Sequence, residues 1–75
     1  MNKKLAPEQR IGLALRRQRE ALGWSQETLS FECGLHRTYI GAVERGEKNL
    51  TVRNIVRIAQ AMNTTAAALM LDAQL

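Results

Sequence analysis

The chain has 75 residues, with 11 lysine and arginine residues against 7 acidic ones and a net charge of +4. A chain this short forms one small domain that buries only about 60% of its unfolded surface. Its single cysteine excludes an intrachain disulfide and is typical of a reducing compartment. The basic balance favours an anionic partner, of which nucleic acid is the commonest.

No targeting or membrane-spanning segment is evident. Lys3 and Lys4 are followed by Pro7 and charged residues rather than by the apolar stretch of a secretory signal. The longest apolar run, residues 66–71, is too short to cross a bilayer. We therefore expect a soluble, cytoplasmic protein with no membrane partner. It should form one domain over residues 1–75, with a core from about 11 to 71 and flexible residues 1–6.

The first expected helix runs from about residue 7 or 8 to 22. Proline suits the first helical turn, where Pro7 stands, because its missing N–H is not needed there. Ile11, Leu15 and Leu22 recur at helical spacing and should face the core. The glycine that follows is a natural stop signal.

Two short helices should follow, on either side of a glycine. The first covers residues 26–33, with Ser25 as its N-cap and Leu29 and Cys33 buried. Gly34 ends it, in a turn that favours a positive φ. The second covers about residues 36–45, where apolar residues mark one face and Arg37, Thr38 and Gly41 fall on the outward face.

A fourth helix is expected over about residues 52–62, with Thr51 as its cap. Its inward residues should be Val52, Ile55, Ile58 (or Val56 and Ala59) and Met62. A fifth should span residues 66–72, capped by Thr64 or Thr65. The one β-prone stretch, residues 50–52, is too short to anchor a sheet. The sequence thus predicts an all-α fold of five helices.

The segment from residue 25 to residue 46 has the form of a helix-turn-helix, whose second helix enters the major groove of DNA. No catalytic arrangement competes with this interpretation, because the chain has one histidine, no nucleophile–base pair and no glycine-rich phosphate loop. Cys33 and His36 make half a metal site at best, and a structural cysteine is the better interpretation. We expect no enzyme, no cofactor and no metal.

The same segment carries a motif spread over both short helices and the residues after them. It consists of Ser25-Gln26-Glu27, Leu29, Gly34-Leu35, Arg37-Thr38-Tyr39-Ile40, Glu44-Arg45-Gly46 and Asn49-Leu50-Thr51. This pattern resembles the Cro/C1-type, lambda repressor-like helix-turn-helix family, and within it the restriction-modification controller proteins. The resemblance implies a five-helix DNA-binding domain and a transcription regulator that binds a pseudo-palindromic operator as a dimer. His36 departs from the aspartate usual in the controllers, which affects the expected sequence preference.

One alternative from another class remains, namely an antitoxin-type helix-turn-helix protein that binds a protein partner as well as its own promoter. A gene neighbourhood with a methyltransferase and an endonuclease would favour the controller, and a neighbouring toxin gene would favour the antitoxin. A domain that merely dimerises is disfavoured by the outward polar residues Gln26, Arg37 and Thr38.

Several residues are candidates for contacting DNA. The resemblance implies that Gln26 holds a phosphate, although it could simply start its helix. Arg37 is the candidate for bidentate contact with guanine, against a phosphate clamp or a solvated arginine. Two further candidates have structural alternatives: Tyr39 could simply be half-buried, and His36 could simply start its helix. The remaining candidates, these two included, are His36, Thr38, Tyr39, Gly41, Arg45, Lys48, Asn49, Thr51 and Arg53.

The resemblance implies three further contacts. Arg19 and Glu44 should form an ion pair that orients the recognition helix, unless both are exposed. Glu27 is placed where some relatives contact RNA polymerase. An apolar excess near the C-terminus predicts a twofold interface, for which the candidates are Met62, Leu69 and Met70.

Overall fold

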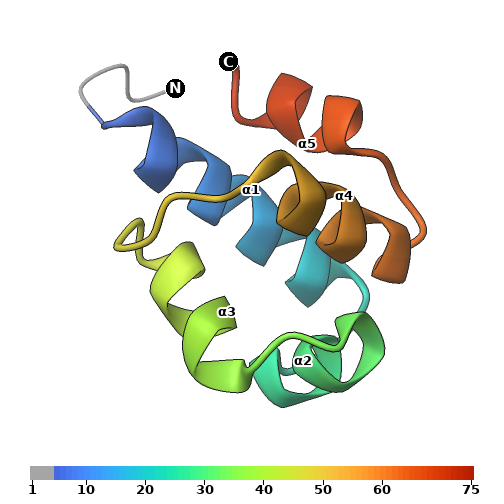
Figure 1. The fold of residues 1–75 in the computed structure, drawn as a ribbon. Coiled ribbons are helices and arrows are strands. Elements are labelled where there is room, and N and C mark those ends of the chain that lie inside the picture. The colour runs from blue at the N-terminus through green and yellow to red at the C-terminus, as the bar shows by residue number, and fades with distance from the viewer. Residues whose placement is uncertain (1–4) are drawn as a thin grey trace.

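The computed structural model describes residues 5–75, which form five helices and no strand. Figure 1 shows α1 running through the middle, with α2 and α3 at one end, α4 across it and α5 at the opposite end. The all-α prediction is confirmed, while the expected flexibility of residues 1–6 stays a prediction, because residues 1–4 lie outside the described part of the chain. The helices are α1 (Pro7–Ala21), α2 (Gln26–Cys33), α3 (Arg37–Glu44), α4 (Val52–Ala61) and α5 (Ala66–Asp72).

The helix boundaries follow from local capping chemistry. The side chains of Ser25, Thr51 and Thr65 each accept a hydrogen bond of 3.0 Å from a backbone N–H of the first turn of α2, α4 and α5. Thr65, not Thr64, therefore caps α5. Gly34 ends α2 with a φ of 73°, a left-handed conformation that glycine adopts without strain.

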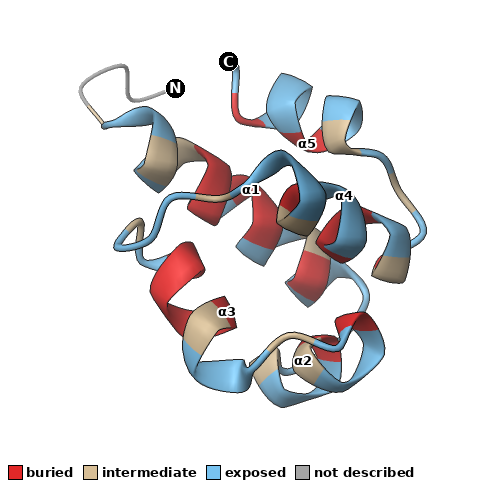
Figure 2. Ribbon diagram, viewed as in Figure 1, coloured by how far each residue is buried: buried red, intermediate tan, exposed pale blue. Residues whose placement is uncertain are grey.

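All five helices contribute to one core. Figure 2 shows buried positions on every helix, including the whole second half of α3. The largest side chains that are fully enclosed are Leu15, Leu29, Ile40, Val43, Ile58 and Met62.

Two residues expected in this core lie outside it. Leu22 is 41% exposed because it is the C-cap of α1, where the chain already turns away. Val52 is 80% exposed because it is the first residue of α4 and lies on the outer side of that helix. Both residues fit the helical spacing of their apolar neighbours, but spacing alone does not show that the buried face ends before the helix terminus.

Two residues expected in a dimer interface also require correction. Met62 and Leu69 are 1% and 2% exposed because they fill the core of their own protomer, so neither is available to a partner. Met70, the third candidate, is 40% exposed. The face of α5 that holds Leu69 is thus the core face, and an interface would use the other one.

Helix α1 is tied to the end of α5 and to the residues that follow it. Arg10, on α1, donates hydrogen bonds to the backbone carbonyls of Ala73 and Gln74, just beyond α5. Arg17 Nε donates to Asp72 Oδ2 over 3.2 Å. These contacts hold α5 against α1 and leave α2 and α3 at the opposite end (Figure 1). Within residues 5–75, no helix combines the length and apolarity needed to span a bilayer.

Candidate DNA-binding surface

The turn between α2 and α3 is fixed from outside by α4. Arg57 Nε donates a hydrogen bond of 2.8 Å to the carbonyl of Cys33, the last residue of α2. Within the turn, the hydroxyl of Ser30 donates to the carbonyl of Leu35. The angle between the two helices is therefore set by contacts to the backbone at the turn as well as by apolar packing.

The start of α3 faces solvent. His36 is its N-cap, and His36 Nδ1 accepts a hydrogen bond of 3.0 Å from the backbone N–H of Thr38. His36, Arg37 and Thr38 are all exposed. The histidine thus initiates the helix, and two polar side chains project from its first turn.

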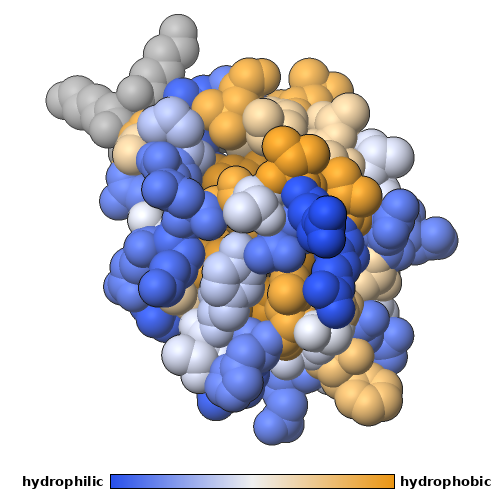
Figure 3. Space-filling model, in the orientation of Figure 1, coloured by the Kyte–Doolittle hydropathy of each residue, from blue (hydrophilic) through white to orange (hydrophobic). Residues whose placement is uncertain are grey.

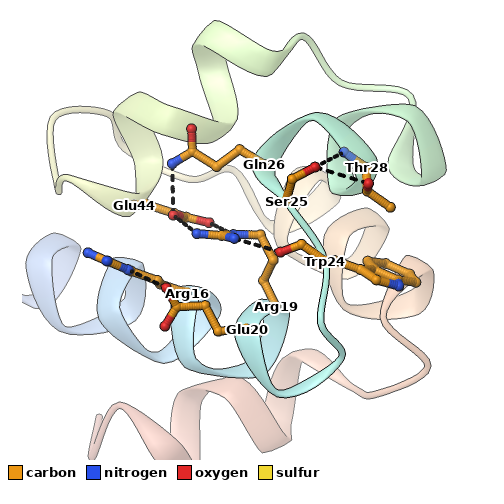
Figure 4. A network of polar contacts seen from close by, with 8 residues as sticks. All are labelled: Arg16, Arg19, Glu20, Trp24, Ser25, Gln26, Thr28 and Glu44. Atoms are coloured by element: carbon orange, nitrogen blue, oxygen red, sulfur yellow. Dashed lines mark hydrogen bonds and ion pairs between the residues drawn. The ribbon is translucent and has the colours of Figure 1, made fainter.

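Beneath this surface lies an ion pair between α1 and α3. Arg19 Nε and Nη2 donate to the two carboxylate oxygens of Glu44 over 2.6 and 2.9 Å, and Arg19 Nη1 donates to the carbonyl of Trp24 over 2.7 Å (Figure 4). Only 9% of the arginine side chain and 3% of the glutamate side chain are exposed. The hydrogen bonds that Arg19 donates to the Glu44 carboxylate raise the pKa of the arginine, so it stays charged. The pairing implied by the family resemblance is present.

Gln26 joins this network, which sequence reasoning missed. Its Nε2 donates a hydrogen bond of 2.9 Å to Glu44 Oε1, and Figure 4 shows its carbonyl oxygen directed away from the carboxylate. The side chain expected to hold a phosphate thus donates one of its two amide hydrogens to a partner within the protein. No sequence signal links residues 26 and 44, because the contact depends on how α2 crosses α3.

Gly41 does not meet solvent as expected. It is buried, and the side chains of Gln26 and Arg45 lie over it. It forms the floor of a shallow depression, so a ligand would meet the side chains at the walls before the glycine backbone. The lining residues are Gln26, Arg37, Thr38, Gly41 and Arg45.

Arg45 is held at the edge of this depression by the loop after α3. Arg45 Nε and Nη2 donate to the two carboxylate oxygens of Glu47 over 3.0 and 3.1 Å. These hydrogen bonds raise the pKa of Arg45 and lower that of Glu47, so both groups are charged at neutral pH. Both are exposed, so the pair orients the guanidinium rather than stabilising the fold.

The remaining candidates lie in α2, in α3 or in the segment that leads from α3 into the first turn of α4. Tyr39 is half-buried, and its hydroxyl accepts a hydrogen bond of 3.1 Å from Asn54 Nδ2 on α4, a partner that the sequence did not reveal. Thr51 serves as the cap of α4. Glu27, the expected contact for RNA polymerase, is exposed on α2. Exposed positions are also occupied by Lys48, Asn49 and Arg53.

The geometry is that of a helix-turn-helix whose second helix presents polar side chains. Comparison with known proteins leads to the same class of fold. The helix-turn-helix family HTH_3 matches residues 15–69, and the chain belongs to this family. The resemblance inferred from the sequence is thereby confirmed.

Among solved structures, the restriction-modification controller protein C.AhdI from Aeromonas hydrophila is 43% identical, with a TM-score of 0.84 over 87% of this chain and 98% of that one. The regulator ClgR from Corynebacterium glutamicum, at 21% identity and a TM-score of 0.90, shares the fold.

Curated relatives give the same picture. A hypothetical transcription factor from Neisseria meningitidis is 48% identical over 52 residues, which is 69% of this chain and 49% of that protein. The control protein C.BamHI from Bacillus amyloliquefaciens is 55% identical over 38 residues, or 51% of this chain and 47% of that protein. The chain therefore spans about half the length of the curated relatives it matches.

Proposed function

We propose that this protein is a restriction-modification controller, a cytoplasmic transcription regulator that binds a pseudo-palindromic operator in double-stranded DNA as a dimer. The observation that carries the proposal is the exposed first turn of α3, where Arg37 and Thr38 project from a helix that the buried Arg19–Glu44 pair fixes on the scaffold. The 43% identity to a controller protein over most of both chains supports it. No feature of the described residues specifically favours the antitoxin alternative.

The proposed contacts divide by chemistry. Arg37 would read guanine, because its guanidinium matches the O6 and N7 acceptors of that base. The loop after α3 and the start of α4 would follow a phosphate strand, since phosphate contacts position a protein on the duplex. The residues proposed for the backbone contacts are Lys48, Asn49, Thr51 and Arg53.

Replacing Arg37 with alanine tests this assignment. Selection from a random DNA pool should yield two half-sites, roughly 34–36 Å apart, for the unchanged protein. Arg37→Ala should lower affinity for that operator by about tenfold or more per half-site, because one good bidentate contact discriminates by about 1–3 kcal/mol. Gel shifts against the operator and a scrambled duplex measure the difference.

The matched control is Arg17→Ala, which removes the same charge from the side of α1 that faces α5. It should keep most of the preference for the operator over the scrambled duplex. If the unchanged protein enriches no sequence, or if Arg37→Ala retains the full preference, the assignment fails.

An apolar surface near the C-terminus supports the dimer. Figure 3 shows hydrophobic side chains gathered on the part of the surface where α5 lies in Figure 1. A groove of about 210 Å³ opens between the start of α1, the start of α4 and the last residues of the chain. A small domain gains stability by covering such a surface with a second copy. The exposed apolar residues that line this groove are Val52, Met70 and Leu75, and Val56 on α4 and Leu71 on α5 are exposed as well.

Met70→Glu should therefore convert the dimer to a monomer at low micromolar concentration, because the substitution places a charge in an apolar contact. Sedimentation velocity measures the change. Phe31→Glu serves as control, since Phe31 is 84% exposed on α2, far from α5 in Figure 1, and should leave the dimer intact. A monomeric unchanged protein, or a Met70→Glu dimer of normal strength, would remove this interface.

A further inference from the structure

Two side chains of opposite hydrogen-bonding character meet above Gly41. A β-carbon placed on this glycine would lie 3.2 Å from Arg45 Nη1 and 3.4 Å from Gln26 Oε1. The two atoms therefore approach the same point from two elements, α2 and the end of α3. The absence of a side chain at position 41 leaves room for both of them on the floor of the depression.

Each of these side chains is oriented by a carboxylate. Glu44 accepts a hydrogen bond from Gln26 Nε2, and Glu47 accepts hydrogen bonds from Arg45 Nε and Nη2. Because a carboxylate only accepts, the amide nitrogen of Gln26 must face Glu44 and the carbonyl oxygen must face away. Arg45 Nη1 is the guanidinium nitrogen that Glu47 leaves unused. The result is a fixed acceptor beside a fixed donor.

Phosphate cannot use both of these groups. Phosphate oxygens only accept hydrogen bonds, so they match Arg45 Nη1 but offer nothing to the carbonyl of Gln26. A base edge in the major groove can offer both. Adenine carries the N6 amino donor and the N7 acceptor on one base, whereas guanine presents two acceptors and thymine an acceptor and a methyl group.

We infer that Gln26 Oε1 and Arg45 Nη1 form a specificity-determining subsite for adenine, with Glu44 and Glu47 as positioning residues. The inference rests on the proposed function, because it assumes that α3 enters the major groove. It assigns base recognition to Gln26, whose expected role was contact with a phosphate, and to Arg45, which was expected only to contact DNA. Gln26 would accept from the adenine N6 amino group, and Arg45 would donate to N7.

The experiment uses base analogues in the operator recovered by selection. Purine in place of the adenine removes the N6 amino group, and 7-deazaadenine removes the N7 acceptor. Each replacement at the proposed position should weaken binding of the unchanged protein by about threefold to tenfold, within the discrimination typical of one such contact. Gln26→Met should lose sensitivity to purine and keep sensitivity to 7-deazaadenine.

Glu47→Gln tests the positioning role without touching the core, because Glu47 is exposed in the loop after α3. It should make binding less sensitive to 7-deazaadenine by about threefold or more. Glu32→Gln, on the exposed side of α2, changes net charge by the same amount and should leave the sensitivity unchanged. A role as a phosphate clamp predicts instead that Glu47→Gln strengthens binding to every sequence equally.

The possible outcomes distinguish a failure of the adenine subsite from a failure of the proposed function. If the unchanged protein selects no operator, the proposed function fails. If it selects an operator in which no adenine shows these analogue effects, or if Glu47→Gln raises all affinities alike, the adenine subsite is overturned and the proposed function stands. The subsite is supported if Gln26→Met loses its sensitivity to purine and Glu47→Gln loses its sensitivity to 7-deazaadenine.

Discussion

Replacing Glu44 with alanine should lower the free energy of unfolding by about 3–5 kcal/mol, because it leaves the buried guanidinium of Arg19 without its counter-ion. The cost falls on a domain of 75 residues, whose total stability is of the order of 5–10 kcal/mol. The substitution also removes the acceptor of Gln26. Urea denaturation followed by circular dichroism measures the loss, and operator binding should fall with the folded fraction.

The chain supplies its own control in Arg16 and Glu20, an ion pair of the same chemistry on the outside of α1, with side chains 56% and 53% exposed. Glu20→Ala should cost no more than about 0.5 kcal/mol. Replacing both Arg19 and Glu44 with methionine should recover much of the loss, since no buried charge then remains. A Glu44→Ala protein as stable as Glu20→Ala would contradict the structural role of the buried pair.

Gly12→Ala should also destabilise the fold, by about 1–3 kcal/mol, although alanine is the better helix former. Helix propensity alone predicts a gain of about 1 kcal/mol. Packing reverses the sign, because the new β-carbon would lie 2.4 Å from the carbonyl oxygen of Val43 and 2.8 Å from that of Glu44. These are backbone atoms, so α1 and α3 must move apart. The same denaturation measurement decides the sign.

The consequence should extend to DNA binding. A displaced α3 would carry Arg37 out of register with the groove and would strain the Arg19–Glu44 contact, which joins the same two helices. We therefore expect a weaker operator preference even where Gly12→Ala is fully folded. A variant that is more stable than the unchanged protein would show that the close approach of α1 to α3 can be relieved without cost.

The helices could be predicted because their signals are local. Ser25 and Thr51 cap helices with their own hydroxyls, and Gly34 ends α2 through its own backbone freedom. Each signal acts within one turn of the chain, so the predicted boundaries differ from the observed ones by about one residue. The family resemblance added the arrangement of the helices, which local signals do not determine.

The distribution of apolar residues between core and surface was harder to predict. Val52 and Met62 both fit the helical spacing of α4, yet one is exposed and the other lies in the core. Helical periodicity defines a stripe on a helix, but the neighbouring helices decide where that stripe is covered. An apolar excess can indicate that an interface exists without showing which side chains form it.

The polar contacts of the site were the least predictable part. The bonds of Gln26 to Glu44 and of Tyr39 to Asn54 join residues that are 18 and 15 positions apart. Whether such side chains meet depends on the crossing of two helices and on their rotamers, neither of which leaves a pattern in the sequence. Arg19 and Glu44 were found because the resemblance paired them, not because their spacing did.

The enclosure of Cys33 gives this protein a native reporter of motion. Cys33, whose thiol is free, is only 6% exposed at the end of α2, where Arg57 donates a hydrogen bond to its backbone carbonyl. A thiol reagent can reach it only when α2 and the turn open, so the modification rate measures the local opening equilibrium of the segment that leads into α3. Because the chain holds no other cysteine, the opening of α2 and the turn can be measured without substituting any residue, both with and without DNA.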